Sequence, residues 1–436
     1  MKRILVVAGT RPEIIKLAPV IRELKKTGKA QVLFVLSGQH YDYEMSMAFV
    51  KDLELPRPDA VLKTGSAPDP VQLGVLTKKL AEFLHDHDVD LVVGQGDTNT
   101  ALAAALASTK SGVPFAHVEA GLRNFDRRMP EELNRMLIAD LAEVNFAPTV
   151  RSAENLICEG VPPDRIEVVG NTVVDSVLWG AKAARERSDV LERLGLEEGG
   201  YVLATVHRVE TADDRVKLGA VMGALSELSK EMKVVIPLHP RTRRNLSRFG
   251  LLRLLRGGDI LLVPPLGYLD FVRLLLGCKL VLTDSGGVQE EALTLGKPCL
   301  TLRRSTERPE TVEAGGNRVT GLNGGDILAS ARRAIKKRMV ARPNPLGDGR
   351  SGERVARAIL RRLEGGGWFE SPSYLREGAP RRRAIVIDGD LAGRSVGEME
   401  RELKCRAMAV FDGSGRFAMP AADLVLRKGD VLITLG

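Results

Sequence analysis

Two carboxylates end strand-like apolar segments of this chain. Asp97 follows one such segment and Glu119 closes another. If both segments are parallel strands, the two acids lie at one edge of a sheet, where a buried acid needs a partner or a task. Thr98 or Asp97 also suits the N-cap of the next helix, and Arg123 offers a simple ion-pair partner. The pair is a candidate for acid–base chemistry, with capping and ion pairing as the plainer explanations.

A third acid and a histidine occupy similar places. Glu131 follows Pro130, which suits the first position of a helix, so the helix dipole favours its charge. Glu131 is also spaced to pair with Arg135. His207 ends a strand-like segment in the second half, and His239 stands at the equivalent place after the next segment. A single histidine is usually structural, but a strand end facing a cleft favours a catalytic role.

Glycine turns that open helices are candidate anion sites. Arg11 and Lys16 surround the first turn of such a helix and could meet a phosphate or remain solvated charges. The sharper motif is Ser285-Gly286-Gly287, whose backbone N–H groups can approach a pyrophosphate at a helix N-terminus. Glu291, two turns into that helix, can accept hydrogen bonds from both hydroxyls of a ribose. Arg308 follows the next strand and suits a phosphate.

The apolar pattern predicts the elements that position these side chains. Short apolar runs alternate with helix-length amphipathic segments, a rhythm typical of two successive Rossmann-like domains with parallel, doubly wound sheets. Ligands of such sheets bind at the carboxyl ends of the strands, so we expect an α/β fold with a cleft between two domains. The predicted strands are 4–8, 32–36, 90–94, 114–118, 201–205, 234–237, 260–263, 280–283 and 298–302.

Changes in rhythm and composition divide the chain. We expect an N-terminal Rossmann-like domain at 1–170, completed by a crossing helix at about 352–363, and a nucleotide-binding domain at 171–351. Residues 364–380 mix Gly, Pro, Ser and charge, as linkers do. A small α+β module should occupy 381–436, with short strands predicted at 384–387, 407–411, 424–426 and 431–433.

The composition narrows the partners. The formal net charge is +8, but aromatic residues make up only 4% and are not interleaved with the basic ones, so a small anionic substrate is favoured over nucleic acid. No apolar run approaches the roughly 18–20 residues of a membrane span, and no signal segment is evident. The 4 cysteines are scattered without metal-ligand spacing. We expect a cytoplasmic protein that needs neither metal nor nicotinamide.

Taken in order, these motifs resemble the non-hydrolysing UDP-N-acetylglucosamine 2-epimerases. The resemblance implies a glycosyltransferase-B fold, a homodimer, no cofactor and interconversion of UDP-GlcNAc and UDP-ManNAc. UDP would leave by anti elimination, giving 2-acetamidoglucal, and then re-add. The resemblance runs from residue 1 to about 363 and is carried by Gly9–Glu13, Gly96–Thr98, His117–Arg123, Pro130–Glu132, His207–Arg208, Asp284–Glu291, Thr306–Glu310 and Asn344–Glu353.

The resemblance also implies roles for single residues. Leu266 stands where bacterial members commonly have a glutamine, which leaves no amide there for uracil. The segment Gln39–Tyr41 resembles the region where some bacterial members bind a second, activating substrate molecule. The catalytic residues around the sugar would be Asp97, Glu119, Glu131 and His207. UDP would be bound by Arg11, Lys16, Phe271, Ser285, Gly286, Gly287, Glu291 and Arg308.

Three other functions compete with this one. A glycosyltransferase of the same fold would use Ser285–Gly287 but needs an acceptor, and the three carboxylates argue against it. A hydrolysing epimerase would release ManNAc and UDP. A regulatory binding protein with an inactive catalytic half would lack an expected catalytic residue, and none is missing.

The C-terminal module carries a second resemblance. Leu391–Ser395, Pro420 and Leu426–Ile433 are similar to the C-terminal ligand-binding module of TrkA-type potassium-transport regulators. Such modules usually pair as dimers and sometimes bind small molecules. The resemblance therefore implies a possible small-molecule ligand for residues 381–436.

Overall fold

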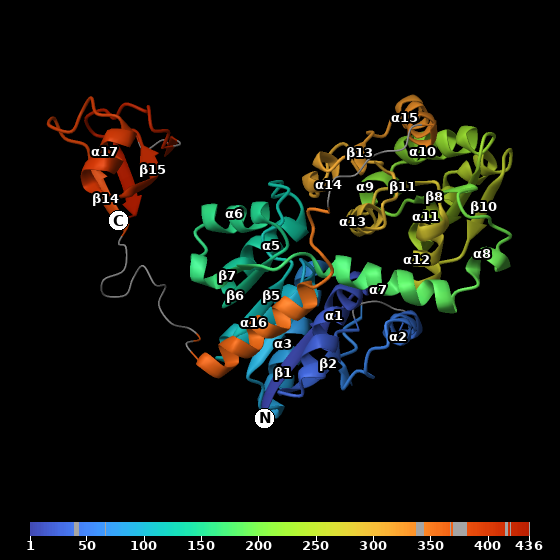
Figure 1. Ribbon diagram of the computed structural model, residues 1–436, viewed down its shortest axis with the longest axis horizontal. Coiled ribbons are helices and arrows are strands. Elements are labelled where there is room, and N and C mark those ends of the chain that lie inside the picture. The colour runs from blue at the N-terminus through green and yellow to red at the C-terminus, as the bar shows by residue number, and fades with distance from the viewer. Residues whose placement is uncertain are drawn as a thin grey trace. The chain divides into compact units, whose positions relative to one another are not determined.

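The computed structural model describes residues 1–38, 43–65, 67–336, 344–366, 368, 382–414, 417–418 and 420–435. The chain forms two compact units, Met1–Trp368 and Phe369–Gly436 (Figure 1). Within the described ranges, no helix is long and apolar enough to cross a membrane. The same ranges contain no group of three or more His, Cys, Asp or Glu side chains that could hold a metal ion.

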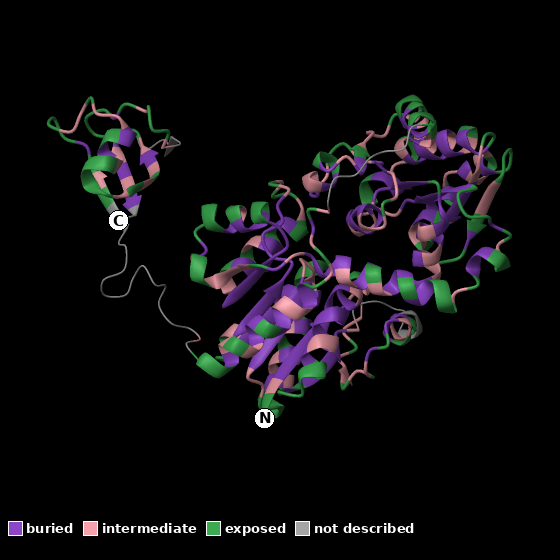
Figure 2. Cartoon of the chain, viewed as in Figure 1, coloured by how far each residue is buried: buried purple, intermediate pink, exposed green. Residues whose placement is uncertain are grey.

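The first half of the larger unit is built on a seven-stranded sheet in the order β3-β2-β1-β4-β5-β6-β7, with every pair parallel. Its strands are largely buried (Figure 2), as parallel sheets covered by helices must be. The strands are β1 (Lys2–Ala8), β2 (Ala30–Leu36), β3 (Ala60–Val61), β4 (Leu91–Gln95), β5 (Phe115–Val118), β6 (Val144–Ala147) and β7 (Ile166–Val168). The helices are α1 (Arg11–Thr27), α2 (Tyr43–Asp52), α3 (Asp69–Asp86), α4 (Asn99–Lys110), α5 (Pro130–Leu141) and α6 (Val150–Cys158).

The second half repeats the plan with a six-stranded parallel sheet in the order β10-β9-β8-β11-β12-β13. Its strands are β8 (Tyr201–Thr205), β9 (Lys233–Pro237), β10 (Ile260–Val263), β11 (Leu280–Thr283), β12 (Cys299–Thr301) and β13 (Asn317–Val319). Its helices are α8 (Val190–Arg193), α9 (Val209–Ala212), α10 (Arg215–Leu228), α11 (Pro240–Arg248), α12 (Tyr268–Gly277), α13 (Gly286–Thr294), α14 (Pro309–Glu313) and α15 (Gly324–Lys336). The predicted fold class, with two Rossmann-like sheets, is confirmed.

Two helices connect the halves. α7 (Thr172–Arg187) packs on α1 of the first half and on α12 and α13 of the second. α16 (Ser351–Gly365) returns onto α1. The approach is close enough that a Cβ on Gly352 would lie 2.6 Å from Pro19 Cβ, so only glycine fits. The Gly352 N–H donates to Asp175 Oδ1 at 2.8 Å, which anchors the start of α16 on α7.

The smaller unit is an antiparallel sheet in the order β14-β17-β15-β16, with one helix. Its elements are β14 (Arg382–Val386), α17 (Val396–Leu403), β15 (Arg406–Phe411), β16 (Phe417–Ala418) and β17 (Val431–Leu435). Its core includes Val396, Met399, Val410 and Leu432. The predicted strand at 424–426 is wrong, because only Val425 forms an isolated bridge. Its backbone hydrogen bonds go to the loop before α17 instead, and the apolar pattern reflects burial of Leu426 in the core.

Candidate active site

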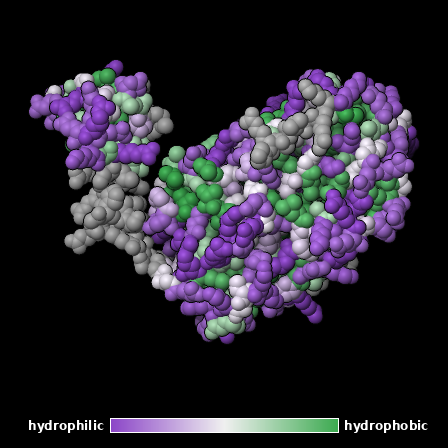
Figure 3. All heavy atoms as spheres, viewed as in Figure 1, coloured by the Kyte–Doolittle hydropathy of each residue, from purple (hydrophilic) through white to green (hydrophobic). Residues whose placement is uncertain are grey.

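Two adjoining cavities, of about 230 and 250 Å³, lie at the carboxyl ends of the strands of both sheets. Both are lined by Lys16, His207, Ser285 and Gly287, which places side chains of both halves around one continuous site. We name the first the apolar cavity and the second the polar cavity. Figure 3 shows a face of the molecule on which hydrophilic side chains alternate with hydrophobic patches.

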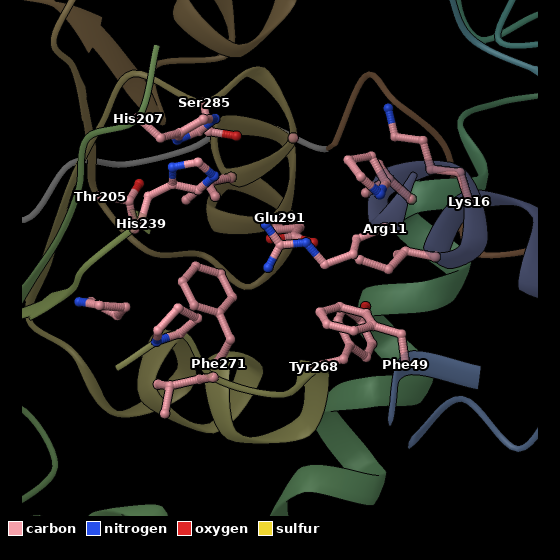
Figure 4. A pocket seen from close by; sticks show the side chains of 18 residues that line it. Arg11, Lys16, Phe49, Thr205, His207, His239, Tyr268, Phe271, Ser285 and Glu291 are labelled. Atoms are coloured by element: carbon pink, nitrogen blue, oxygen red, sulfur yellow. The ribbon is translucent and has the colours of Figure 1, made fainter. Parts of the chain in front are cut away.

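The apolar cavity is lined by aromatic rings and by several charged side chains (Figure 4). Arg11 and Lys16 come from α1, and His207, His239 and Ser285 come from the second half. The rings are Phe49, Tyr268 and Phe271, with Leu266 beside them. A cavity with ring side chains and basic groups in its wall suits a flat base that is joined to a negatively charged group.

Glu291 lies in the wall of the apolar cavity and is 6% exposed. Burial, helped by the charge of the neighbouring Glu290 and opposed by Lys16, raises the pKa of Glu291 to about 8. A ligand whose hydroxyl groups donate hydrogen bonds to Glu291 would replace the water that burial removes and would favour the ionised carboxylate.

Replacing Glu291 with glutamine should stabilise the ligand-free protein at alkaline pH. The folded-state pKa of about 8 lies above the ordinary 4.5, so the folded form holds the proton longer than the unfolded form. Stability is therefore full below about pH 4.5 and falls as the pH rises through about 8. Thermal unfolding of parent and Glu291→Gln at about pH 5 and pH 8.5 should show a difference that grows with pH. The exposed Glu82→Gln should track the parent, and equal pH dependence in all three proteins would contradict the assignment.

A buried network of two cations and two carboxylates adjoins the polar cavity, which three of its members, Lys16, Glu119 and Arg308, line. Lys16 Nζ lies 2.7 Å from Glu119 Oε1 and 3.3 Å from Glu290 Oε2. Arg308 bridges the same acids, at 3.1 Å to Glu119 and 3.0 Å to Glu290. Gln95 Nε2 donates to Glu119 at 2.6 Å. Although burial alone lowers the pKa of Lys16, Glu119 and Glu290 hold it above its ordinary value, so the lysine is charged.

The backbone of Glu119 is strained. It follows β5 with a φ of 67°, in the left-handed region that residues other than glycine rarely adopt. Such a conformation costs of order 1–3 kcal/mol and persists where the surrounding contacts impose it. In this conformation the carboxylate contacts Lys16 and Arg308. Backbone strain of this kind is frequent at functional sites.

Asp97 lines the polar cavity beside this network. Arg135 Nε donates to Asp97 Oδ2 at 2.8 Å and Arg135 also contacts Glu132 Oε2 at 2.6 Å. Thr98 is the N-cap of α4, accepting from the Ala101 N–H at 3.2 Å. Capping thus explains Thr98 but not Asp97, whose carboxylate pairs with Arg135 at the wall of the polar cavity.

His207 is oriented by a buried acid. Its Nδ1 lies 3.2 Å from Asp284 Oδ1, and Asp284 also accepts from the backbone N–H groups of His207 and Arg208 at 2.9 Å each. Burial opposes ionisation of Asp284, but these donors hold its pKa below the ordinary value. The His207 and His239 rings lie close to each other, with centroids 5.8 Å apart and planes tilted by 39°.

Ser285 and the two glycines open α13 as predicted. Ser285 is the N-cap and Gly286 the first helical residue. A Cβ on Gly286 would lie 3.2 Å from Arg308 Cζ, so glycine lets the guanidinium approach the helix start. A Cβ on Gly287 would meet no described atom within 4 Å, because this position faces the cavities. The helix N-terminus and the Arg308 guanidinium lie next to each other, an arrangement whose chemistry suits an anion.

One predicted catalytic residue is not brought to the site. Glu131 is exposed in the first turn of α5 and is not among the residues that line either cavity. Its predicted partner Arg135 pairs with Asp97 and Glu132 instead, and Arg123 pairs with Glu159 at 2.5 Å. The role of Glu131 stays a prediction. The segment Gln39–Tyr41 lies outside the described residues.

The structure adds two acids that sequence reasoning did not single out. Glu290, together with Glu119, neutralises Lys16 and Arg308. Glu13 is 1% exposed and lines the polar cavity, accepting from Thr10 N–H at 2.6 Å and Thr98 Oγ1 at 2.7 Å. Burial raises the pKa of Glu13 to about 7. The Thr10-x-x-Glu13 capping box was the sequence signal for this residue.

Two facing Rossmann-like sheets with a nucleotide-sized cleft define an α/β protein of the glycosyltransferase-B type. The sequence model of UDP-N-acetylglucosamine 2-epimerase matches residues 22–360. The UDP-N-acetylglucosamine 2-epimerase of Methanococcus maripaludis is 40% identical over 365 residues, which is 83% of this chain and 99% of the relative. The chain belongs to the UDP-N-acetylglucosamine 2-epimerase family.

Two further relatives are informative. The crystal structure of the Methanocaldococcus jannaschii UDP-GlcNAc 2-epimerase in complex with UDP-GlcNAc and UDP is similar with a TM-score of 0.77 and 41% identity, covering 83% of this chain and 100% of that one. A UDP-2,3-diacetamido-2,3-dideoxy-D-glucuronate 2-epimerase of Pseudomonas aeruginosa is 37% identical over 82% of this chain and 99% of the relative. The sugar carried on UDP therefore varies among relatives of this chain.

Proposed function

We propose that this chain is a non-hydrolysing epimerase that interconverts UDP-GlcNAc and UDP-ManNAc. The observation that carries the proposal is the network of Lys16, Glu119, Glu290 and Arg308, which faces Asp97 and the start of α13 in one cavity. It supplies carboxylates for proton transfer and cations for a departing diphosphate at the same place. The two cations of the network are balanced by its two carboxylates, so no excess positive charge is present for a carboxylate on the sugar. We therefore propose a neutral sugar.

We propose that UDP binds across the two cavities. We assign the uridine to the apolar cavity, with uracil against Phe271 and the ribose hydroxyls donating to Glu291. The diphosphate would lie over Ser285–Gly287, with Arg11 and Arg308 as its cations. Leu266 in the wall then offers uracil an apolar contact.

The proposed chemistry is an elimination followed by an addition. A carboxylate takes the C2 proton, the electron pair of that bond forms the C1–C2 double bond, and the C1–O bond breaks so that UDP leaves with its electrons. The products are 2-acetamidoglucal and UDP, whose negative charge the helix start and Arg308 stabilise. Re-addition of UDP with a proton delivered to the opposite face of C2 completes the epimerisation. Asp97, Glu119 and Glu131 are the proposed acids and bases, with His207 beside them.

The test is incubation of the protein with UDP-GlcNAc alone, followed by chromatography of the nucleotide sugars. UDP-ManNAc should form until an equilibrium mixture is reached. Free ManNAc with UDP would identify a hydrolysing epimerase instead. Failure to react without an acceptor would favour a glycosyltransferase, and conversion of a UDP-glucuronate derivative alone would point to the substrate type of the Pseudomonas relative.

We also propose that the protein is a homodimer, joined through α3 and α5. Both helices pack on α4, and they expose the apolar side chains Val71, Leu133 and Leu137, which are 57%, 39% and 54% exposed. Covering such side chains is a common reason for subunit pairing. Sedimentation equilibrium should give twice the chain mass for the parent and a lower mass for Leu137→Lys. A monomeric parent would contradict the proposal.

We propose that residues 381–436 act as a separate module that resembles the TrkA-type C-terminal module and binds a small molecule. A chain ending after Trp368 should then keep its fold and a kcat/KM within about twofold of the full chain, because few contacts cross such linkers. Circular dichroism and the epimerase assay check this. A folded but inactive shortened chain would contradict the separation.

The reaction is proposed to take place in the cytoplasm.

A further inference from the structure

A third cavity, of about 400 Å³, lies next to the polar cavity and shares Arg208 with it. Its lining comes from the loop before α5 on one side and from segments of the second sheet's half on the other. Five of its side chains are basic: Arg128, Arg208, Lys217, Arg303 and Arg304. Arg208 also lines the polar cavity, but none of the five is assigned a contact with UDP, so their convergence needs its own explanation.

The two inner arginines share one carboxylate. Arg208 lies 3.0 Å from Glu307 Oε1, and Arg303 pairs with the other oxygen of the same acid. The side chains of Arg208 and Arg303 are only 24% and 12% exposed, and Glu307 is 1% exposed. Although burial opposes it, the charges of Arg308, Arg208 and Arg303 hold the pKa of Glu307 far below its ordinary range. Glu307 is therefore ionised and supplies one negative charge for two guanidinium groups.

Arg308 does not add to this positive excess, because Glu119 and Glu290 balance its charge. At the rim, Arg128 pairs with Asp126 at 2.8 Å and Lys217 with Asp214 at 2.9 Å, in exposed positions that solvent screens. Glu210 is a further acid on the rim. The base of the cavity therefore keeps one poorly solvated positive charge in excess.

We propose that this cavity binds a small oxyanion of the phosphate type, as free phosphate or as a phosphate monoester, at a site distinct from that of UDP. The planar guanidinium fork matches phosphate oxygens with two parallel hydrogen bonds. Arg303 and Arg304 are adjacent on the loop after β12, and the hydroxyl of Ser305 lines the same space. Because Arg128 faces them from the first half, a bound oxyanion contacts both sides of the cleft and is linked to ligand binding between them.

The test is calorimetric titration of the full-length protein carrying one molar equivalent of UDP, so that the proposed UDP site is already filled. Inorganic phosphate and glucose 6-phosphate are titrated separately into the parent, Arg304→Gln and the double variant Arg303→Gln/Arg304→Gln. The matched control is Arg332→Gln, an exposed arginine of α15 paired with Glu231. Thermal unfolding confirms that each variant is folded. Binding is the readout, so the result does not depend on whether the proposed reaction occurs.

The parent and Arg332→Gln should bind one oxyanion per chain. Arg304→Gln should bind about tenfold more weakly, as expected for one lost charge-assisted hydrogen bond, and the double variant more weakly still. Tighter binding of glucose 6-phosphate than of phosphate would identify a monoester as the preferred ligand, and the reverse would identify free phosphate. Absence of saturable binding to the parent, or equal affinity in the parent and the double variant, would overturn the proposal.

Discussion

Glu119→Gln is expected to lower kcat for UDP-GlcNAc epimerisation by about 10²–10⁴-fold, the range for loss of an acid–base group. The carboxylate lies 2.7 Å from Lys16 Nζ and 3.1 Å from Arg308, and its backbone is held at a φ of 67°. An amide in its place cannot take a proton and presents an NH₂ group to two cations. Asp97→Asn and Glu131→Gln should fall in the same range under the proposed mechanism.

The matched control is Glu159→Gln, which removes an acid paired with Arg123 away from the cavities. It should keep kcat near the parent value. Thermal unfolding separates loss of fold from loss of chemistry, because Glu119→Gln disturbs a buried ion pair. Near-normal turnover in folded Asp97→Asn, Glu119→Gln and Glu131→Gln would remove the assignment. Loss of turnover in the first two variants alone would show that Glu131, which is exposed in the structure, takes no part in the reaction.

Arg308→Met is expected to lower the free energy of unfolding by about 3–5 kcal/mol, the usual cost of breaking a buried ion pair. Its guanidinium lies 3.1 Å from Glu119 and 3.0 Å from Glu290, so its removal leaves buried acids with one cation fewer. The variant should also bind UDP at least tenfold more weakly, since it loses a charged hydrogen-bond donor to the diphosphate.

Urea unfolding and UDP titration measure the two effects. Arg332→Met, which removes an exposed arginine, should change stability by no more than about 1 kcal/mol and leave UDP affinity unchanged. Parental stability in Arg308→Met would show that the buried network is not maintained in solution. Parental UDP affinity would remove Arg308 from the proposed diphosphate site.

Much of the fold can be predicted from the sequence because parallel strands are buried on both faces. Segments such as 201–205 and 280–283 are therefore continuous apolar runs, and they coincide with β8 and β11. The helix start at Ser285-Gly286-Gly287 can also be predicted from the sequence, because a helix start that meets an anion favours glycine. Short strands such as β7 (Ile166–Val168) are too brief for such a pattern and were missed.

The site could be predicted only in part, because its contacts join residues far apart in the chain. Lys16 meets Glu290 across the two halves, and no local pattern indicates that pairing. Glu290 and Glu291 are neighbours in sequence, but successive helical residues point about 100° apart. One therefore joins the ion network while the other lines the apolar cavity. Helical spacing suggested Arg135 as a partner for Glu131, but Asp97 and Glu132 take it.

The most direct test of the proposed reaction is proton NMR of UDP-GlcNAc with the full-length protein in heavy water. Removal of the C2 proton by a carboxylate and its return from the opposite face predict that UDP-ManNAc appears with deuterium at C2, and that recovered UDP-GlcNAc becomes deuterated there as equilibrium is approached. The loss of the C2 proton signal should follow the rate of epimerisation. Formation of UDP-ManNAc that retains its original C2 hydrogen would contradict the elimination mechanism, and absence of UDP-ManNAc would contradict the proposed function.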